Sequence, residues 1–171
     1  MKKKLIGSIV ILMLLIFFTS CSKEGKAIKT VKRGYFPLIS EVTIEKGSDR
    51  FLINPEYTAF DGNDGYYYVN ISGECDVEKL NKGFSHSKFI SSMGDPEEFE
   101  KLGPFDHLKD SNIIFQYYID LKTKDFGLNA ISVDGIEQSL DYDSEEYWLL
   151  LLFADSYDTL AKYMMNLTGL Y

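Results

Sequence analysis

The apolar and polar positions of residues 35–171 alternate in some segments with a period of two, which is typical of strands. Further strands are predicted where aromatic and β-branched residues gather between turn-forming residues. The strands predicted in these two ways are residues 41–45, 51–53, 66–72, 113–120, 126–133 and 136–140. In the third of them, Tyr67, Val69 and Ile71 share one face, and Tyr66 and Tyr68 lie on the other.

Clusters of Gly, Pro, Asn and Asp predict where these strands are interrupted. The predicted turns are residues 47–49, 54–55, 61–65 and 134–135. Asp134-Gly135 indicates a tight hairpin, because both residue types readily adopt a positive φ.

Helix signals appear in the middle of the chain and at its end. Asp76 is a candidate cap for a short helix, and Asp95-Pro96 is the start of another, which we expect to end at Gly103-Pro104. Apolar residues at helical spacing predict a last helix over 157–167, which Gly169 can end.

Residues 147–154 are almost wholly apolar, so their periodicity fits a buried strand or a buried helix. Their leucine content favours a helix. We interpret them as a strand because the run is only eight residues long and Asp155-Ser156 can cap a following helix.

Together these elements predict an α+β fold. It consists of a mainly antiparallel sheet, short helices between its strands and a C-terminal helix packed on one face. No repeat or flexible linker interrupts residues 35–171, so we expect them to form a single globular domain.

The first residues of the chain have the composition of a targeting segment. Three lysines precede an apolar run from Leu5 to Phe18, which is short for a membrane-spanning helix and typical of a secretory signal peptide. The junction Phe18-Thr19-Ser20-Cys21 resembles the lipobox of bacterial lipoproteins. This resemblance covers residues 1–21 only. It implies cleavage between Ser20 and Cys21, a diacylglyceryl group on the Cys21 thiol, and acylation of the new amino group.

Residues 21–34 are predicted to be the lipidated cysteine followed by a basic tether. The stretch Ser22–Gly34 contains five Lys or Arg residues against one Glu, with few apolar residues and no clear period. Two interpretations stay open. In the first, the basic residues contact an anionic membrane surface, and each contributes about 1 kcal/mol to binding. In the second, the stretch is a linker that needs only to be hydrophilic. We expect the domain to lie outside the cytoplasm, anchored to the cell membrane or the outer membrane.

Composition and charge narrow the class of partner. The chain has 171 residues and a formal net charge of −8, with 45% hydrophobic and 26% charged residues. These proportions are those of a folded globular protein, which argues against disorder throughout. The acidic balance argues against non-specific nucleic-acid binding and favours a basic protein partner. Three of the lysines belong to the signal, so the mature domain is more acidic still.

The sequence contains no recognisable motif for catalysis, a metal or a cofactor. We expect no metal and no cofactor, and an enzymatic activity stays the alternative to a binding role. Once Cys21 is lipidated, the remaining thiol is Cys75, which no motif joins to His86 or His107. We therefore expect a buried cysteine rather than a nucleophile. Zinc-ligand spacings, hydrolase nucleophile motifs and glycine-rich phosphate loops are missing from the sequence.

Two acidic loops have the composition of cation sites. In the loop over 61–65, the calcium pattern of an EF-hand fails at Gly65 and Ser72, and a hairpin turn accounts for the same residues. The loop over 141–146 is equally ambiguous.

The candidate ligand or partner surface combines two tyrosines with the second acidic loop. It consists of Tyr66, Tyr68, Asp141, Asp143, Glu145 and Glu146. The tyrosines would form an exposed aromatic platform for a sugar ring or a protein partner, unless helices cover both faces of the sheet.

These observations favour a membrane-tethered envelope lipoprotein that acts as a binding or interaction module rather than as an enzyme. A protein of the immunity type, which neutralises a basic toxin, and an envelope assembly factor both fit. The alternative is an envelope hydrolase that uses carboxylates, or a carbohydrate-binding accessory protein.

Overall fold

The structure is a computed structural model, and it describes residues 22–35, 42–140, 148–149, 151 and 157–167. The fold is α+β, as predicted. Its sheet has five antiparallel strands in sequential order, and the two described helices that precede it in the chain pack against it. The strands are β1 (Leu52–Asp61), β2 (Tyr67–Cys75), β3 (Asn112–Ile119), β4 (Phe126–Val133) and β5 (Ile136–Glu137). The main helices are α2 (Lys23–Arg33), α3 (Ile44–Phe51), α4 (Val77–Ser85), α5 (Lys88–Ser91), α6 (Pro96–Lys101) and α8 (Tyr157–Leu167), with a 3-10 turn η1 (Asp106–Leu108).

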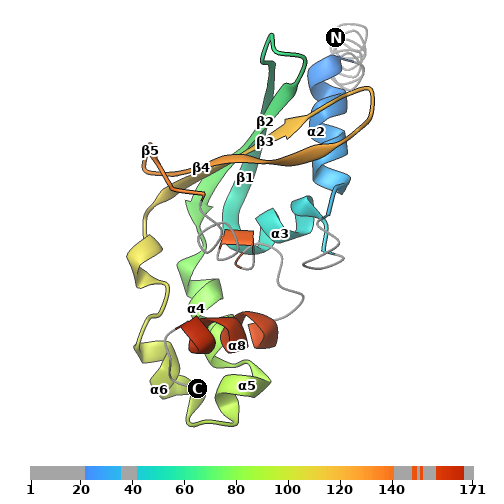
Figure 1. The fold of residues 1–171 in the computed structure, drawn as a ribbon. Helices are drawn as coiled ribbons and strands as arrows, with labels where there is room; N and C mark the ends of the chain where they lie inside the picture. Colours follow the sequence, from blue (N-terminus) through green and yellow to red (C-terminus); the bar gives the residue numbers. More distant parts are fainter. Residues whose placement is uncertain (1–21, 36–41, 141–147, 150, 152–156, 168–171) are drawn as a thin grey trace, which may run out of the picture.

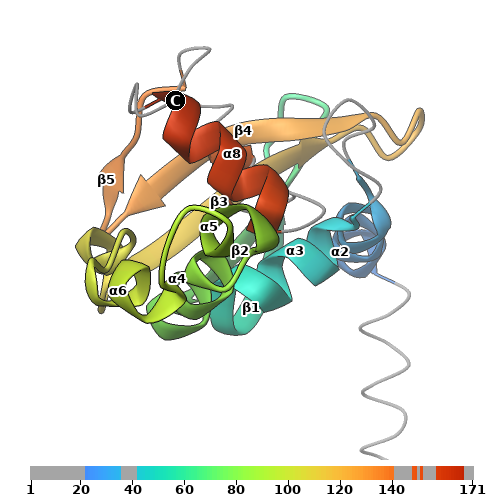
Figure 2. The same cartoon turned by 90° about the horizontal axis from the view of Figure 1, so that it is seen from below.

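The elements are distributed between two ends of the molecule. Figure 1 shows the start of α2 and the turn between β1 and β2 at one end, and α4, α5, α6 and α8 at the other. Helix α8 packs against α4 and α5, and Figure 2 shows it running beside α5. Within the described part of the chain, no helix combines the length and the apolar character needed to cross a bilayer.

Side chains alternate along each strand between two faces of the sheet, one of which is buried while the other is half-buried or exposed. Partners in register share a face, so Val69 opposite Tyr117 and Ile71 opposite Phe115 lie on the same side. All of these side chains are buried. Helices α2 and α3 contribute to this core, whose centre includes Trp148 packed edge-on against Phe115 at 6.0 Å.

Several local predictions are confirmed. Asp76 accepts the Lys79 N–H and caps α4, and Asp95 accepts the Glu97 N–H and caps α6. The hairpin at Asp134-Gly135 has φ values of 51° and 78°, as a two-residue turn of this type requires. The last helix has the predicted bounds.

The predicted strand at 41–45 and turn at 47–49 are wrong, because Ile44–Phe51 form helix α3. Thr43 accepts the Lys46 N–H at the start of this helix. Its buried residues are Ile44, Gly47, Ser48 and Phe51. That spacing is helical, with two small residues completing the apolar side. The alternation of only two apolar positions was too short to distinguish a strand.

Strand β1 is longer than predicted, and β5 is shorter. Asn54-Pro55 does not end β1, because a register shift between Ile53 and Glu56 accommodates the proline in an edge strand. Asn54 takes a φ of 47° at this irregularity. The predicted strand 136–140 is reduced to two residues.

The strand predicted over 147–154 is also wrong wherever the structure describes it. Trp148, Leu149 and Leu151 are helical and buried. The leucine content was therefore the better indicator, since straight-chain and γ-branched residues favour helices over strands.

The stretch Ser22–Gly34, predicted to be a basic tether, forms helix α2 over Lys23–Arg33. The Ser22 hydroxyl accepts the Gly25 N–H at 3.0 Å and caps the helix. Ala27 and Val31, one helical turn apart, are fully buried, and α2 contacts β1, β2 and β3. A stripe this narrow gives a weak periodic signal, which the five basic residues of the stretch obscured.

Candidate functional site

The second face of the sheet carries polar and aromatic side chains that are half-buried or exposed. We call it the open face. Its residues on β1 to β4 are Glu56, Thr58, Phe60, Tyr68, Asn70, Ser72, Ile114, Gln116, Tyr118, Ala130 and Ser132. None of them belongs to the hydrophobic core of the described residues. The helices that build the core contact the opposite side, where Lys32 of α2 lies over the Tyr57 ring.

Four rings form an aromatic cluster at one end of the open face. Phe60, Tyr68 and Tyr118 are neighbours across β1, β2 and β3. Phe60 stacks on Tyr68 with ring centroids 5.5 Å apart, and Tyr66 meets Tyr118 edge-on at 5.7 Å. Phe60 is 44% exposed and Tyr66 42%. These rings support one another while leaving large apolar surfaces to solvent, which marks a contact site more often than a structural one.

The neighbouring strand and turn hold two of these rings in place. Gly127 lies directly opposite Tyr118, and a Cβ atom there would come within 2.6 Å of the tyrosine ring. The ring therefore lies across the glycine. The Tyr68 hydroxyl donates to Asp64 at 2.7 Å, which lowers the pKa of the Asp64 carboxyl and raises that of the Tyr68 hydroxyl.

A row of side-chain amides lies next to the aromatic cluster. The Gln116 amide nitrogen donates to the Asn70 oxygen at 2.9 Å, and the Asn129 nitrogen donates to the Gln116 oxygen at 2.7 Å. This chain of hydrogen bonds crosses β2, β3 and β4. Among the described residues, the Asn70 amide nitrogen and the Asn129 amide oxygen have no further side-chain partner, so both ends can bind a ligand.

The charge of the strands has one sign. None of the five strands contains Lys or Arg, although the whole chain has 18 of these residues. Their charged residues are Glu56, Asp61, Glu74 and Glu137. Glu56 and Glu137 lie on the first and last strands, so they flank the sheet from opposite edges.

Sequence reasoning found half of the aromatic cluster. Tyr66 and Tyr68 lie on the open face as the alternation predicted, whereas Phe60 and Tyr118 were missed. The strand pattern already placed Tyr118 in a strand, but no local signal shows which strands pair. The other candidates, Asp141, Asp143, Glu145 and Glu146, lie outside the described residues, as do Ser20 and Cys21.

Aspartates accept backbone hydrogen bonds in two turns, one of which is the loop over 61–65 that had the composition of a cation site. Asp61 accepts the Asn63 N–H at 2.9 Å, and Asp120 accepts the Lys122 N–H at 2.7 Å. The second of these bonds lowers the pKa of the Asp120 carboxyl. In the part of the chain described, no three His, Cys, Asp or Glu residues are grouped closely enough to hold a metal ion.

The remaining chemical candidates do not form a catalytic arrangement in the described residues. Cys75 is buried, and burial raises the pKa of its thiol to about 12, which suppresses the reactive thiolate. The His86 ring nitrogen lies 3.6 Å from a Glu100 carboxylate oxygen, at the end of the molecule that contains α4, α5, α6 and α8. Both side chains are largely exposed there, where an ion pair contributes little.

Of the hollows in the described residues, two lie near the two ends of β2. The larger, of about 530 Å³, lies between the turns that follow β1 and β3 and includes Lys23, Asp61, Tyr66 and Lys122. The smaller, of about 320 Å³, lies beside α4 and is rich in carboxylates. Its acidic residues are Glu74, Asp76, Glu78, Asp106 and Asp110. Lys109 also lines this hollow, but the carboxylates outnumber it and make the potential beside Glu74 of β2 negative.

Comparison with protein-family models, with curated proteins and with solved structures finds no match to this chain.

Proposed function

We propose that the protein is a lipid-anchored binding module of the cell envelope, and that its open face binds a basic protein partner. The observation that carries this proposal is the open face itself. On this face, exposed aromatic rings lie next to a row of side-chain amides, and the strands that carry them contain acidic residues and no basic ones. An immunity-type protein and an assembly factor would both use such a surface.

The chemistry of this surface suits lysine and arginine side chains. Phe60 and Tyr66 offer ring faces for cation–π contacts, and amide oxygens accept hydrogen bonds from guanidinium and ammonium groups. Glu56 and Glu74 are exposed, so they attract a cationic partner without a large desolvation cost. A broad face of this kind fits a protein surface better than a small molecule, which is usually held in a cleft.

A carbohydrate ligand is the second candidate, and the aromatic cluster beside the amide row favours it. Sugar rings stack on exposed aromatic side chains, and their hydroxyl groups pair with amides. The two candidates differ in their response to charge, because a neutral sugar is insensitive to the sign of a nearby charge.

The test changes that charge at one open-face position. Thr58 is exposed, and it lies on β1 two residues from Phe60. The full-length protein, Thr58→Lys and Thr58→Glu would be captured from the native cell after brief cross-linking, with bound proteins quantified by mass spectrometry. We expect one near-stoichiometric basic protein, lost in Thr58→Lys and retained in Thr58→Glu.

Other outcomes would redirect the proposal. A partner retained equally by both variants would contradict the charge argument. Glycan enriched in place of protein, and reduced equally by both substitutions, would support the carbohydrate candidate. A Cys21→Ala version serves as the anchor control, and it should leave the membrane fraction.

A further inference from the structure

Helix α2 begins immediately after the predicted lipid anchor. Its cap is Ser22, and its first residue is Lys23. The two residues from Cys21 to Lys23 span at most about 7 Å, even when fully extended. Too little chain therefore separates the anchor from the folded domain to act as a flexible leash.

Helix α2 is also fixed to the sheet. Ala27 and Val31 are fully buried against it. Near the end of the helix, the Lys32 ammonium group lies 4.4 Å from the centre of the Tyr57 ring and 2.6 Å from Glu45 of α3. Because the apolar side of α2 is part of the core, the helix cannot swing away without unfolding it.

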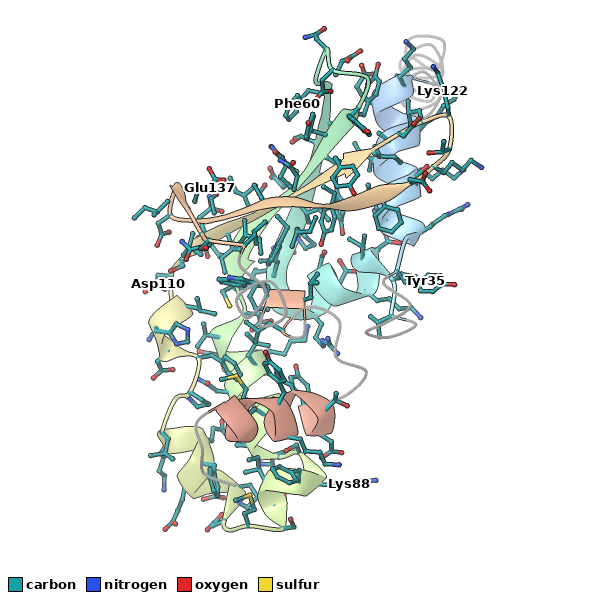
Figure 3. All side chains as sticks on the ribbon, in the orientation of Figure 1. Tyr35, Phe60, Lys88, Asp110, Lys122 and Glu137 are labelled. Atoms are coloured by element: carbon teal, nitrogen blue, oxygen red, sulfur yellow. The ribbon has the colours of Figure 1, made fainter. Side chains whose placement is uncertain are left out.

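The start of α2 lies at the same end of the molecule as two turns. Lys23 lines the larger hollow together with Asp61 and Tyr66 after β1, and with Asp120 and Lys122 after β3. We call this the turn end: the start of α2, residues 61–66 and residues 120–125. Figure 3 shows Lys122 and Phe60 at this end and Lys88 at the opposite, helical end.

We propose that the turn end lies directly on the phospholipid headgroups of the membrane that holds the anchor. This inference rests on the lipid anchor of the proposed function, and it adds a fixed orientation of the domain. The residues it brings to the interface suit it. Lysine extends its ammonium group towards phosphate while its aliphatic stem stays close to the protein surface.

The charges of the turn end are nearly balanced, so they do not bind a membrane without the anchor. The basic residues are Lys23, Lys26, Lys122 and Lys124, and the acidic ones are Glu24, Asp61, Asp64, Asp120 and Asp125. The covalent anchor and the rigidity of α2 therefore set the orientation, and anionic lipid has little effect on it.

This orientation limits where the partner can bind. The open face would rise from the bilayer along the strands, and the nine residues of β2 span about 30 Å. A protein bound on this face must present its basic surface within roughly that height of the same membrane. A partner that is itself embedded in the membrane or held at its surface meets this condition.

The test compares probes at the two ends of the molecule. Lys122 and Lys88 are both exposed, so the variants Lys122→Cys and Lys88→Cys can each carry a fluorescent label. Cys75 can stay in place, since it is buried and its thiol pKa of about 12 protects it from labelling near neutral pH. The acylated full-length protein would be reconstituted into phosphatidylcholine vesicles with a collisional quencher on the headgroups.

We expect the probe at position 122 to be quenched several-fold more strongly than the probe at position 88. A flexible Gly-Ser insertion between Cys21 and Ser22, which leaves the Ser22 cap of α2 in place, should abolish this difference while the protein still floats with the vesicles. Equal quenching of both probes on floating protein would overturn the orientation and leave the anchor intact. Failure of the acylated protein to float would overturn the anchor and the orientation together.

Discussion

Replacing Val31 by alanine tests whether α2 belongs to the fold or is a tether. Val31 is fully buried, so the substitution removes two methyl groups from the core. Their transfer accounts for about 1.6 kcal/mol, at about 0.8 kcal/mol for each buried carbon. The cavity adds about 1 kcal/mol, and the better helix propensity of alanine returns about 0.5 kcal/mol. We therefore expect the free energy of unfolding to fall by about 2 kcal/mol.

Urea unfolding of the acyl-free chain measures this change through Trp148, the one tryptophan, which is buried beside Phe51 and Phe115. With a slope of about 2 kcal/mol per molar urea, the midpoint should fall by about 1 M. Lys29→Ala in the same helix is the matched control. Lys29 is exposed, so its replacement should stay within about 0.5 kcal/mol of the original protein. Equal midpoints for the two variants would refute the packing of α2 described above.

Three further predictions concern single groups. Thiol reagents at pH 8 should leave Cys75 unlabelled until the protein unfolds, because its thiol is buried and has a pKa of about 12; rapid labelling of the native protein would contradict this burial. Removing the hydroxyl donor with Tyr68→Phe should raise the pKa of Asp64, as measured by NMR titration, because the largest cause of its lowered value is lost. The pKa of Asp64 is lower in the folded than in the unfolded protein, so the ionised carboxyl stabilises the fold at pH values above the unfolded pKa. This contribution is lost as the pH falls through the folded pKa. An unchanged pKa of Asp64 in Tyr68→Phe would refute the role of this bond. Gly135→Ala should lower the free energy of unfolding, measured by thermal unfolding, by about 1 kcal/mol, because φ at this position is 78°. Gly135→Asn should lower it less, because asparagine tolerates a positive φ better than alanine does. Two substitutions without effect on stability would contradict this turn geometry.

The sequence predicted the elements whose signals are local and chemically specific. Asp76, Asp95 and Asp134-Gly135 each act through hydrogen bonds or φ preferences within a few residues, and all of them formed as expected. Strand β2 was equally clear, since aromatic and β-branched residues alternate along it.

The errors arose where tertiary packing decides the structure. Helices α2 and α3 bury small or widely spaced residues, such as Ala27 and Gly47, so their amphipathic sides were not evident from hydrophobicity. The site was half predicted for a related reason. Alternation placed Tyr66 and Tyr68 on one face, but only the pairing of strands brings Phe60 and Tyr118 beside them.

The most direct test of partner binding on the open face is site-specific photo-cross-linking in the native cell. Benzoylphenylalanine would replace Phe60 on the open face or, as control, Tyr35 after α2; these aromatic side chains are 44% and 48% exposed. Figure 3 shows them in different parts of the molecule. The proposed function predicts one discrete adduct with a basic protein from position 60 and none from position 35. Equal adducts from both positions, or none from position 60, would contradict it.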